Sequence, residues 1–223
     1  MANVVVKDSH ITYNGVGYFR GNAEEVQCGS IGQKRSPITK QNYLEVKDQL
    51  SADKIGTAKS TKVKIDFNQS NKSAFNTALS AIIKGVPVKL SGDAQFSKLS
   101  SGELDLIKLS VSTNQMKKAA NNSSNKLNSL DGWGQNARIC HQIFVVVSAE
   151  LATQFDGDVE INLSAGSGGI EAKTGVSSTT HNATKIVIAP GTTFAYLLAK
   201  IDWEGHGENK QIKDLDDDQY SFS

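Results

Sequence analysis

The run IFVVVSAEL, which begins at Ile143, restricts the fold of this chain more than any other part of its sequence. In residues 139–151 apolar side chains occur at both odd and even positions, so a strand formed there would be apolar on both faces. A strand of that kind lies in the interior of a sheet, with a neighbour on each side. The segment therefore predicts a central strand.

Further strands are predicted by segments in which apolar and polar residues alternate. These segments are residues 4–18 (a hairpin with its turn at 13–17), 62–67, 86–96, 104–111, 159–165, 170–178, 185–188 and 193–203. The stretch VIAPGTTFAYLLAKI, residues 187–201, is expected to form a buried hairpin whose turn is made by Pro190 and Gly191.

Helical spacing of apolar residues predicts a clear helix at 70–84, a short helix at 42–50, and a mixture of helix and mobile loop at 113–136. Residues 21–38 have the composition of a loop. Together the elements predict the α+β class: a single domain, residues 1–204, with a twisted, mainly antiparallel β-sheet, long β-hairpins and two or three helices. Residues 205–223, which include DLDDD, are expected to be a polar, acidic tail.

Composition excludes several classes of function. The formal net charge of +1 gives no reason to expect binding to nucleic acid. No apolar run approaches the ~18 residues that a transmembrane helix needs, and the start MANVVVKDSH lacks the features of a signal peptide. The two cysteines, Cys28 and Cys140, do not make a disulfide framework. We therefore expect a reduced protein that is cytoplasmic as synthesised.

Motifs that carry chemistry are sparse. The four histidines are dispersed without ligand spacing, so neither a metal site nor a cofactor is expected. Cys28, in a glycine-flanked polar loop, is the candidate for modification, whereas Cys140 is expected in the core. SADK at 51–54 and KTG at 173–175 match elements of serine acyl-transfer enzymes, and between them SSN at 123–125 matches the S-D-N element loosely, because it lacks the aspartate. No apolar helix face follows SADK, however, and we expect no enzyme.

Two predicted hairpins, residues 86–111 and 158–178, alternate apolar residues with charged or polar ones. Each is long enough for the ~9–11-residue strands of a transmembrane β-barrel. In such a barrel the polar faces of the strands line a channel, and the closed ring of strands gives every backbone N–H and carbonyl a hydrogen-bond partner. The same alternation is typical of any half-buried antiparallel sheet. The pattern alone leaves both interpretations open.

Two blocks of the sequence resemble the gasdermin pore-forming domain: IFVVVSAELATQ at residues 143–154, followed by an alternating hairpin, and KIVIAPGTTFAYLLAKI at residues 185–201. In the second block the matching residues are Val187, Ile188, Pro190, Gly191, Phe194, Ala195 and Leu197. LIKLSVSTNQMKK, residues 106–118, stands where the family has a strand that leads to a helix and loop, so the resemblance covers about residues 86–203. The chain departs from the family in having no residue between the proline and the glycine, and no basic helix near its start.

The resemblance implies a pore-forming protein, which is a soluble monomer that oligomerises in an anionic membrane after activation by a protease or a partner protein. For the contacts with lipid headgroups we name Lys34, Arg35, Lys40, Lys89, Lys98 and Lys108. The inserting hairpins, residues 86–111 and 159–178, would carry Val88, Leu90, Phe96, Leu104, Leu106, Val159, Ile161, Leu163 and Ile170. The alternative hypothesis is a non-enzymatic binding module, such as an immunity, adaptor or effector-associated protein, whose sheet stays folded. A serine acyl-transfer enzyme is the third hypothesis.

Overall fold

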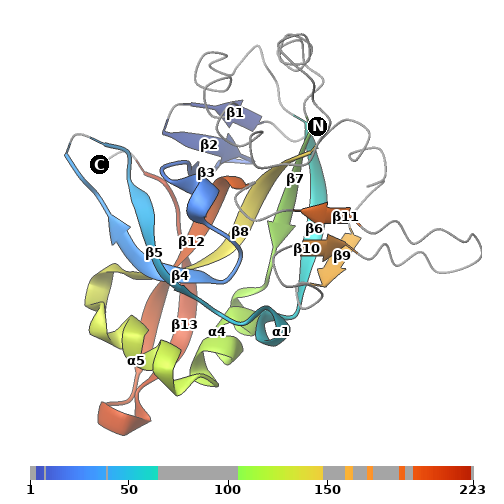
Figure 1. The fold of residues 1–223 in the computed structure, drawn as a ribbon. Coiled ribbons are helices and arrows are strands. Elements are labelled where there is room, and N and C mark those ends of the chain that lie inside the picture. Colours follow the sequence, from blue (N-terminus) through green and yellow to red (C-terminus); the bar gives the residue numbers. More distant parts are fainter. Residues whose placement is uncertain are drawn as a thin grey trace, which may run out of the picture.

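The chain forms one α+β domain built on a curled, mainly antiparallel β-sheet, as the sequence predicted (Figure 1). The computed structural model describes residues 4–7, 9–38, 40–64, 105–147, 159–162, 170–172, 186–188 and 193–221. The predicted helix at 70–84 and the predicted strand at 86–96 lie outside these residues.

The predicted central strand is confirmed as β8, Ala137–Val147. It pairs with β7 (Asp105–Ser110) on one side and with β12 (Thr193–Glu204) on the other, and its first residues also pair with β4 (Ser30–Arg35). Consecutive residues Ile143, Phe144 and Val145 are each at most 1% exposed, so both faces of the strand are buried. This double burial explains the unbroken apolar run, because neither face meets water.

The strands of the main path follow the order β1-β2-β3-β12-β8-β7-β6-β9-β10-β11. The bounds not yet given are β1 Val4–Val6, β2 His10–Tyr13, β3 Val16–Phe19, β6 Thr57–Lys64, β9 Val159–Asn162, β10 Ile170–Ala172 and β11 Ile186–Ile188. Off this path, β5 (Tyr43–Gln49) pairs with β4, and β13 (Gln211–Asp218) pairs with β12. The predicted N-terminal hairpin is present as β2–β3, and its turn residues Asn14 and Gly15 have φ of 50° and 82°, as a tight hairpin turn requires.

Three α-helices are described: α1 (Ala52–Ile55), α4 (Thr113–Asn121) and α5 (Ser124–Gly132). Short 3-10 turns occupy η1 (Ala23–Glu25), η2 (Gly134–Asn136) and η3 (Gly207–Asn209). A reciprocal capping box between Ser112 and Gln115 begins α4, which buries Met116, Ala119 and Ala120 in the core. Residues 113–136 are therefore helical and turn structure, where the sequence predicted a partly mobile loop.

Two local predictions in the N-terminal third are wrong. Residues 21–38 contain strand β4, and residues 42–50, predicted as a helix, contain strand β5. Over these short segments the pairing of β4 with β5 and β8 overrides local composition. Leu44 of β5 is fully buried and the backbone N–H of the same residue is bonded inside the core.

Two predicted hairpins pair differently from the prediction. Strand β7 has β6 on one side and β8 on the other, so residues 86–96 are not its partner and the hairpin predicted at 86–111 is wrong. Strand β11 pairs with β10, whereas β12 pairs with β8, β3 and β13, so residues 187–201 are not a hairpin either.

The connection 189–192, which contains Pro190 and Gly191, instead joins strands from distant places in the sheet order. In a flat sheet β11 and β12 would lie about 29 Å apart, at ~4.8 Å per strand. The connection spans at most about 18 Å, so the sheet must curl to bring β11 back toward the start of β12.

The predicted C-terminal tail is also corrected, because residues 211–218 form β13 along most of the second half of β12. Ile212 and Leu215 point into the core and are 1% and 5% exposed. The side chain of Asn121 on α4 exchanges two hydrogen bonds with the backbone of Ile212, at 2.9 and 3.0 Å. Ile212 and Leu215 are three residues apart, so the sequence lacks the strict alternation of a strand. The register shift between Asp202 and Trp203 in the pairing of β12 with β13 allows both apolar residues to face the core.

The phenol of Tyr196, on β12, joins three elements inside the core. Its Oη donates to the Gly21 carbonyl at 2.7 Å and accepts from the Leu44 N–H at 2.8 Å. We expect Tyr196→Phe to lower the free energy of unfolding by about 1–3 kcal/mol, because it leaves a buried N–H and carbonyl without this partner. Urea unfolding measures the change, with Tyr43→Phe, at a partly exposed tyrosine, as the control. Equal midpoints for the wild type and Tyr196→Phe would contradict this account.

Candidate functional site

The first feature of interest is one end of the four-stranded unit β6-β7-β8-β12. Each strand is antiparallel to the next, and Lys64 pairs with Asp105, Asp105 with Val147, and Val145 with Thr193. The end of β6, the start of β7, the end of β8 and the start of β12 therefore lie side by side. We call this the insertion end, because residues 65–104 and 148–192 both leave the unit there.

The second feature is the turn between β4 and β5, which carries an exposed apolar residue. Ile38 is fully exposed, and it is the one large apolar side chain so exposed among the described residues. An open pocket of about 730 Å³ lies beside it. The pocket is lined by Arg20, Gly21, Asn22, Ile38, Lys40, Gln41, Tyr43 and Tyr220. This lining contains two cations and no carboxylate among the described residues, so the pocket suits an anion.

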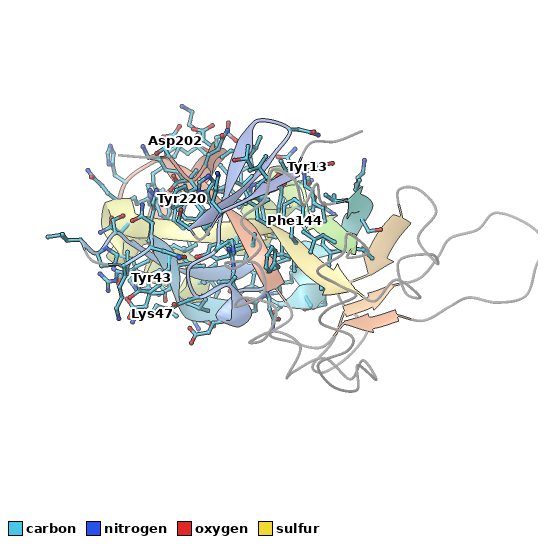
Figure 2. All side chains as sticks on the ribbon, turned by 90° about the horizontal axis from the view of Figure 1, so that it is seen from above. Tyr13, Tyr43, Lys47, Phe144, Asp202 and Tyr220 are labelled. Atoms are coloured by element: carbon cyan, nitrogen blue, oxygen red, sulfur yellow. The ribbon has the colours of Figure 1, made fainter. Side chains whose placement is uncertain are left out.

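Close backbone contact shapes the wall of this pocket. Gly21 forms a bridge with Tyr43, and a Cβ at Gly21 would lie 2.7 Å from the Asn42 carbonyl and 2.9 Å from the Tyr43 Cβ. Only glycine fits there without movement of the strand. Figure 2 shows Tyr43 and Tyr220 on the same side of the molecule, although they come from β5 and from the segment after β13. The pocket therefore exists only when the C-terminal segment is in place.

The four predicted headgroup residues that the structure describes, Lys34, Arg35, Lys40 and Lys108, do not form one patch. Lys34 contacts both carboxylate oxygens of Asp218, at 2.9 and 3.0 Å, and Arg35 contacts Glu45 at 2.6 Å. Lys40 is exposed and lines the pocket. Lys89 and Lys98 lie outside the described residues. Lys40 thus lines the same pocket as Arg20, a residue that no sequence motif singled out.

Lys108, the last of these residues, lies on β7 and does not line the pocket. Its Nζ is 5.2 Å from the centre of the Tyr13 ring and 5.7 Å from that of Tyr18, and burial lowers the pKa of its ammonium group. Figure 2 shows the neighbouring aromatic side chains Tyr13 and Phe144, whose rings are 5.5 Å apart. Lys108 is thus packed against the aromatic cluster of Tyr13, Tyr18 and Phe144.

The residues predicted to insert into a membrane lie in different parts of the structure. Leu106, on β7, is fully buried in the sheet. Val159 and Ile161 lie on β9 and Ile170 on β10, where β9 and β10 form an antiparallel pair. Val88, Leu90, Phe96, Leu104 and Leu163 lie outside the described residues.

The C-terminal segment is fastened to the sheet by charged and aromatic contacts. Asp218 contacts Lys34 and also Arg138 of β8, whose side chain is only 10% exposed. The Nε2 atom of buried His141 lies 3.0 Å from Oδ1 of Asp217. Tyr220 stacks on His10 with ring centres 4.8 Å apart, and its N–H donates to the Gly17 carbonyl. Sequence reasoning treated these residues as a solvated tail and missed all of these contacts.

Cys28 is not the exposed thiol that its glycine-rich surroundings predicted. It is 4% exposed, with its sulfur near the carbonyls of Leu109 and His141, and burial raises its pKa to about 12. The glycine after it, Gly29, has a φ of 86° and allows the chain to turn inward. Cys140 is fully buried, as predicted, and burial also raises its pKa.

The elements matched to serine acyl-transfer enzymes lie on the surface where they are described. Ser51 and Lys54 are exposed at the four-residue helix α1, and Ser123 precedes α5. Residues 173–175 lie outside the described residues. An acyl-transfer serine is activated by a lysine within a shielded site, and exposed positions do not supply that environment.

Comparisons with known proteins add no family to this picture. No model of a known protein family, no curated protein and no solved structure matches the chain. In the part of the chain that the structure describes, no helix is long and apolar enough to cross a membrane. The same residues contain no cluster of three or more His, Cys, Asp or Glu side chains that could hold a metal ion.

The carboxylate of Asp217 gives a test by pH. The contact with His141 lowers the pKa of the Asp217 carboxylate below the ordinary 3.8. The charged carboxylate therefore stabilises the fold at pH values above about 3.8. We expect Asp217→Asn to be less stable than the wild type at neutral pH. The difference should shrink as the pH falls below about 4, where the unfolded-state carboxylate takes up its proton first, and should be lost as the pH passes through the lower pKa of the folded state.

Urea unfolding at pH 3, 5 and 7 measures this dependence. The matched control is Asp216→Asn, on the exposed face of the same strand. A difference between Asp217→Asn and the wild type that stayed constant over this range would show that the carboxylate charge is not what stabilises β13.

The two thiols give a second test. In the folded protein a pKa of about 12 leaves Cys28 with roughly a thousandfold less thiolate at neutral pH than an ordinary cysteine. We expect both cysteines to react with an aromatic disulfide reagent only after unfolding in guanidinium. One thiol that reacted at once in the native protein would contradict the burial of Cys28, the residue nearer the surface.

Proposed function

We propose that this chain is a pore-forming protein that binds an anionic membrane, assembles with further copies and lengthens two strand pairs into membrane-spanning hairpins. One observation carries the proposal. The two longest connections, residues 65–104 and 148–192, leave the same end of one antiparallel four-stranded unit. Hairpins that continued β6 into β7 and β8 into β12 would therefore emerge side by side.

Chain length supports this extension. Each connection supplies about 20 residues for each arm of a hairpin, and a transmembrane strand needs only ~9–11. The two hairpins would continue an existing ladder, so each new backbone N–H and carbonyl would find a partner in the neighbouring arm. The outermost arms would pair with those of adjacent copies, because an open sheet edge is not tolerated in hydrocarbon.

The β4–β5 turn supports a contact with lipid before insertion. Exposed Ile38 can enter the interfacial region of a bilayer, and Lys40 in the adjoining pocket would then meet the anionic headgroups. Arg20 lines the same pocket, while its guanidinium also donates to the Lys7 carbonyl and lies over the Phe194 ring. Each cation near an anionic surface contributes about 1 kcal/mol. Lys34 and Arg35, which the sequence also suggested, are held in ion pairs within the protein.

Dye release from vesicles tests this function. We expect the wild type, before or after limited proteolysis, to release dye from phosphatidylserine-containing vesicles and much less from vesicles of phosphatidylcholine alone. Ile38→Asp should slow release about tenfold, because it removes ~1.4 kcal/mol or more of apolar insertion. Lys54→Glu, at an exposed position on α1, is the control and should release dye as the wild type does. If no treatment led to release from any vesicle, the proposed function would be wrong.

A second candidate function is a binding module whose sheet stays folded, and the anion-suited pocket is the observation that favours it. Calorimetric titration with inorganic phosphate would detect this activity. Binding that is lost in Arg20→Ala, without any dye release, would support the module over the pore.

A further inference from the structure

The pocket beside Ile38 is larger than an inorganic anion needs. Its volume of about 730 Å³ lies within the range of about 300–1,000 Å³ that is typical of pockets for small organic molecules. A phosphate ion would fill only a small part of this space. A ligand that suits the pocket therefore carries a further group, and the side chains of the lining indicate what that group is.

Lys40 supplies a positive charge that the fold does not neutralise. Its side chain is exposed, and no carboxylate of the described residues lies within ion-pair distance of it. The carboxylate of Glu45, which follows the pocket residues on β5, contacts Arg35 and Lys47 instead. Arg20 adds to the positive potential, although its guanidinium also makes contacts within the protein. Lys40 is therefore the group that would bind a phosphate directly.

Two tyrosines line the same pocket, and the fold holds both in place. Tyr220 stacks on His10, with ring centres 4.8 Å apart and 9° between the ring planes, so one face of its ring is covered. Tyr43 is held by its bridge to Gly21. The ring of Tyr43 is half-buried, and no ring or cation of the described residues contacts it. Tyr43, labelled in Figure 2, thus offers a flat apolar surface to a ligand.

The remaining side chains of the lining suit a planar ring that carries polar groups on its edge. Asn22 and Gln41 each have an amide, which contains both donors and an acceptor. The edge of a nucleobase likewise presents both donors and acceptors, and its two faces are apolar. Ile38 adds an exposed aliphatic side chain beside these amides. The lining therefore combines a cation for a phosphate, an aromatic ring for a base and amides for the edge of that base.

We infer that this pocket binds a nucleoside monophosphate, with the phosphate on Lys40 and the base on the ring of Tyr43. Every nucleobase has a face that stacks on an aromatic side chain, whereas the phosphate of a lipid headgroup would leave the ring unused. The inference rests on the second candidate function, the anion-suited pocket, whose ligand class it names. It holds whether or not the chain forms a pore.

Calorimetric titration of the wild type tests the ligand class. The probes are the 5′-monophosphates of adenosine, guanosine, cytidine and uridine, with ribose 5-phosphate as the matched compound that lacks a base. We expect at least one nucleotide to bind about tenfold more tightly than ribose 5-phosphate, because one stacked base contributes about that factor. Glycerol 3-phosphate, which carries the phosphate of a lipid headgroup, should bind no more tightly than ribose 5-phosphate.

Substitutions at two positions test the assigned contacts. Tyr43→Leu removes the ring and should bring the Kd of the nucleotide to within about twofold of that of ribose 5-phosphate, whereas the matched Tyr43→Phe keeps the ring and should bind as the wild type does. Lys40→Ala should weaken binding of nucleotide and ribose 5-phosphate alike by about tenfold, because both lose a charge-assisted hydrogen bond. Lys54→Ala, at an exposed lysine on α1 outside the pocket lining, should leave both affinities unchanged.

The outcomes separate this inference from the functions proposed above. Glycerol 3-phosphate that bound as tightly as every nucleotide would keep an anion pocket and overturn the nucleotide. Nucleotide binding that was unchanged in Tyr43→Leu and in Lys40→Ala would place the ligand elsewhere and also overturn the inference. If no phosphate compound bound, the inference and the second candidate function would both be wrong. Nucleotide binding by a protein that releases no dye would keep the inference and reject the pore.

Discussion

The antiparallel pairing of β8 with β7 and β12 is the interaction on which the rest of the structure depends. β8 lies between these strands with both faces buried, and β4 adds to it at its start. Because the strands are antiparallel neighbours, their ends are forced together, and the two longest connections leave from one place. The same ladder that forms the core therefore decides which parts of the chain can be lengthened and in which direction.

A few buried polar groups connect the peripheral elements to this core. Tyr196 binds the backbone of Gly21 and of Leu44, and Asp218 joins the C-terminal strand to Lys34 and Arg138. Burying any of these polar groups without a hydrogen-bond or ion-pair partner would cost free energy. The fold therefore favours the one arrangement in which each group keeps its partners. The pocket beside Ile38 is a product of these contacts, because its walls come from the residues after β3, the β4–β5 turn and the C-terminal segment.

Edges and charges give the four-stranded unit two different sides. The lysine-bearing strand β6, paired with β9, stands at one side, and the aspartate-bearing strand β13, against which α4 packs, stands at the other. β11 is joined to the start of β12 by residues 189–192, and a connection this short requires the sheet to curl. Pro190 and Gly191 of that connection thus lie between two strands that are not neighbours in the sheet, whereas the local sequence pattern predicts a simple hairpin.

The sequence by itself determined the α+β class, the central strand (predicted at 139–151, observed as β8 at 137–147) and the N-terminal hairpin. Continuous or alternating apolar residues and an Asn-Gly turn act through local geometry. It could not determine which strands are neighbours: β7 pairs with β6 and β11 with β10, since pairing depends on contacts between residues far apart in the chain. For the same reason the sequence did not predict strands β5 and β13 or the burial of Cys28. Of the predicted lipid contacts that the structure describes, only Lys40 lies in the pocket, because a site assembled from three separate segments exists only after the tertiary structure has brought them together.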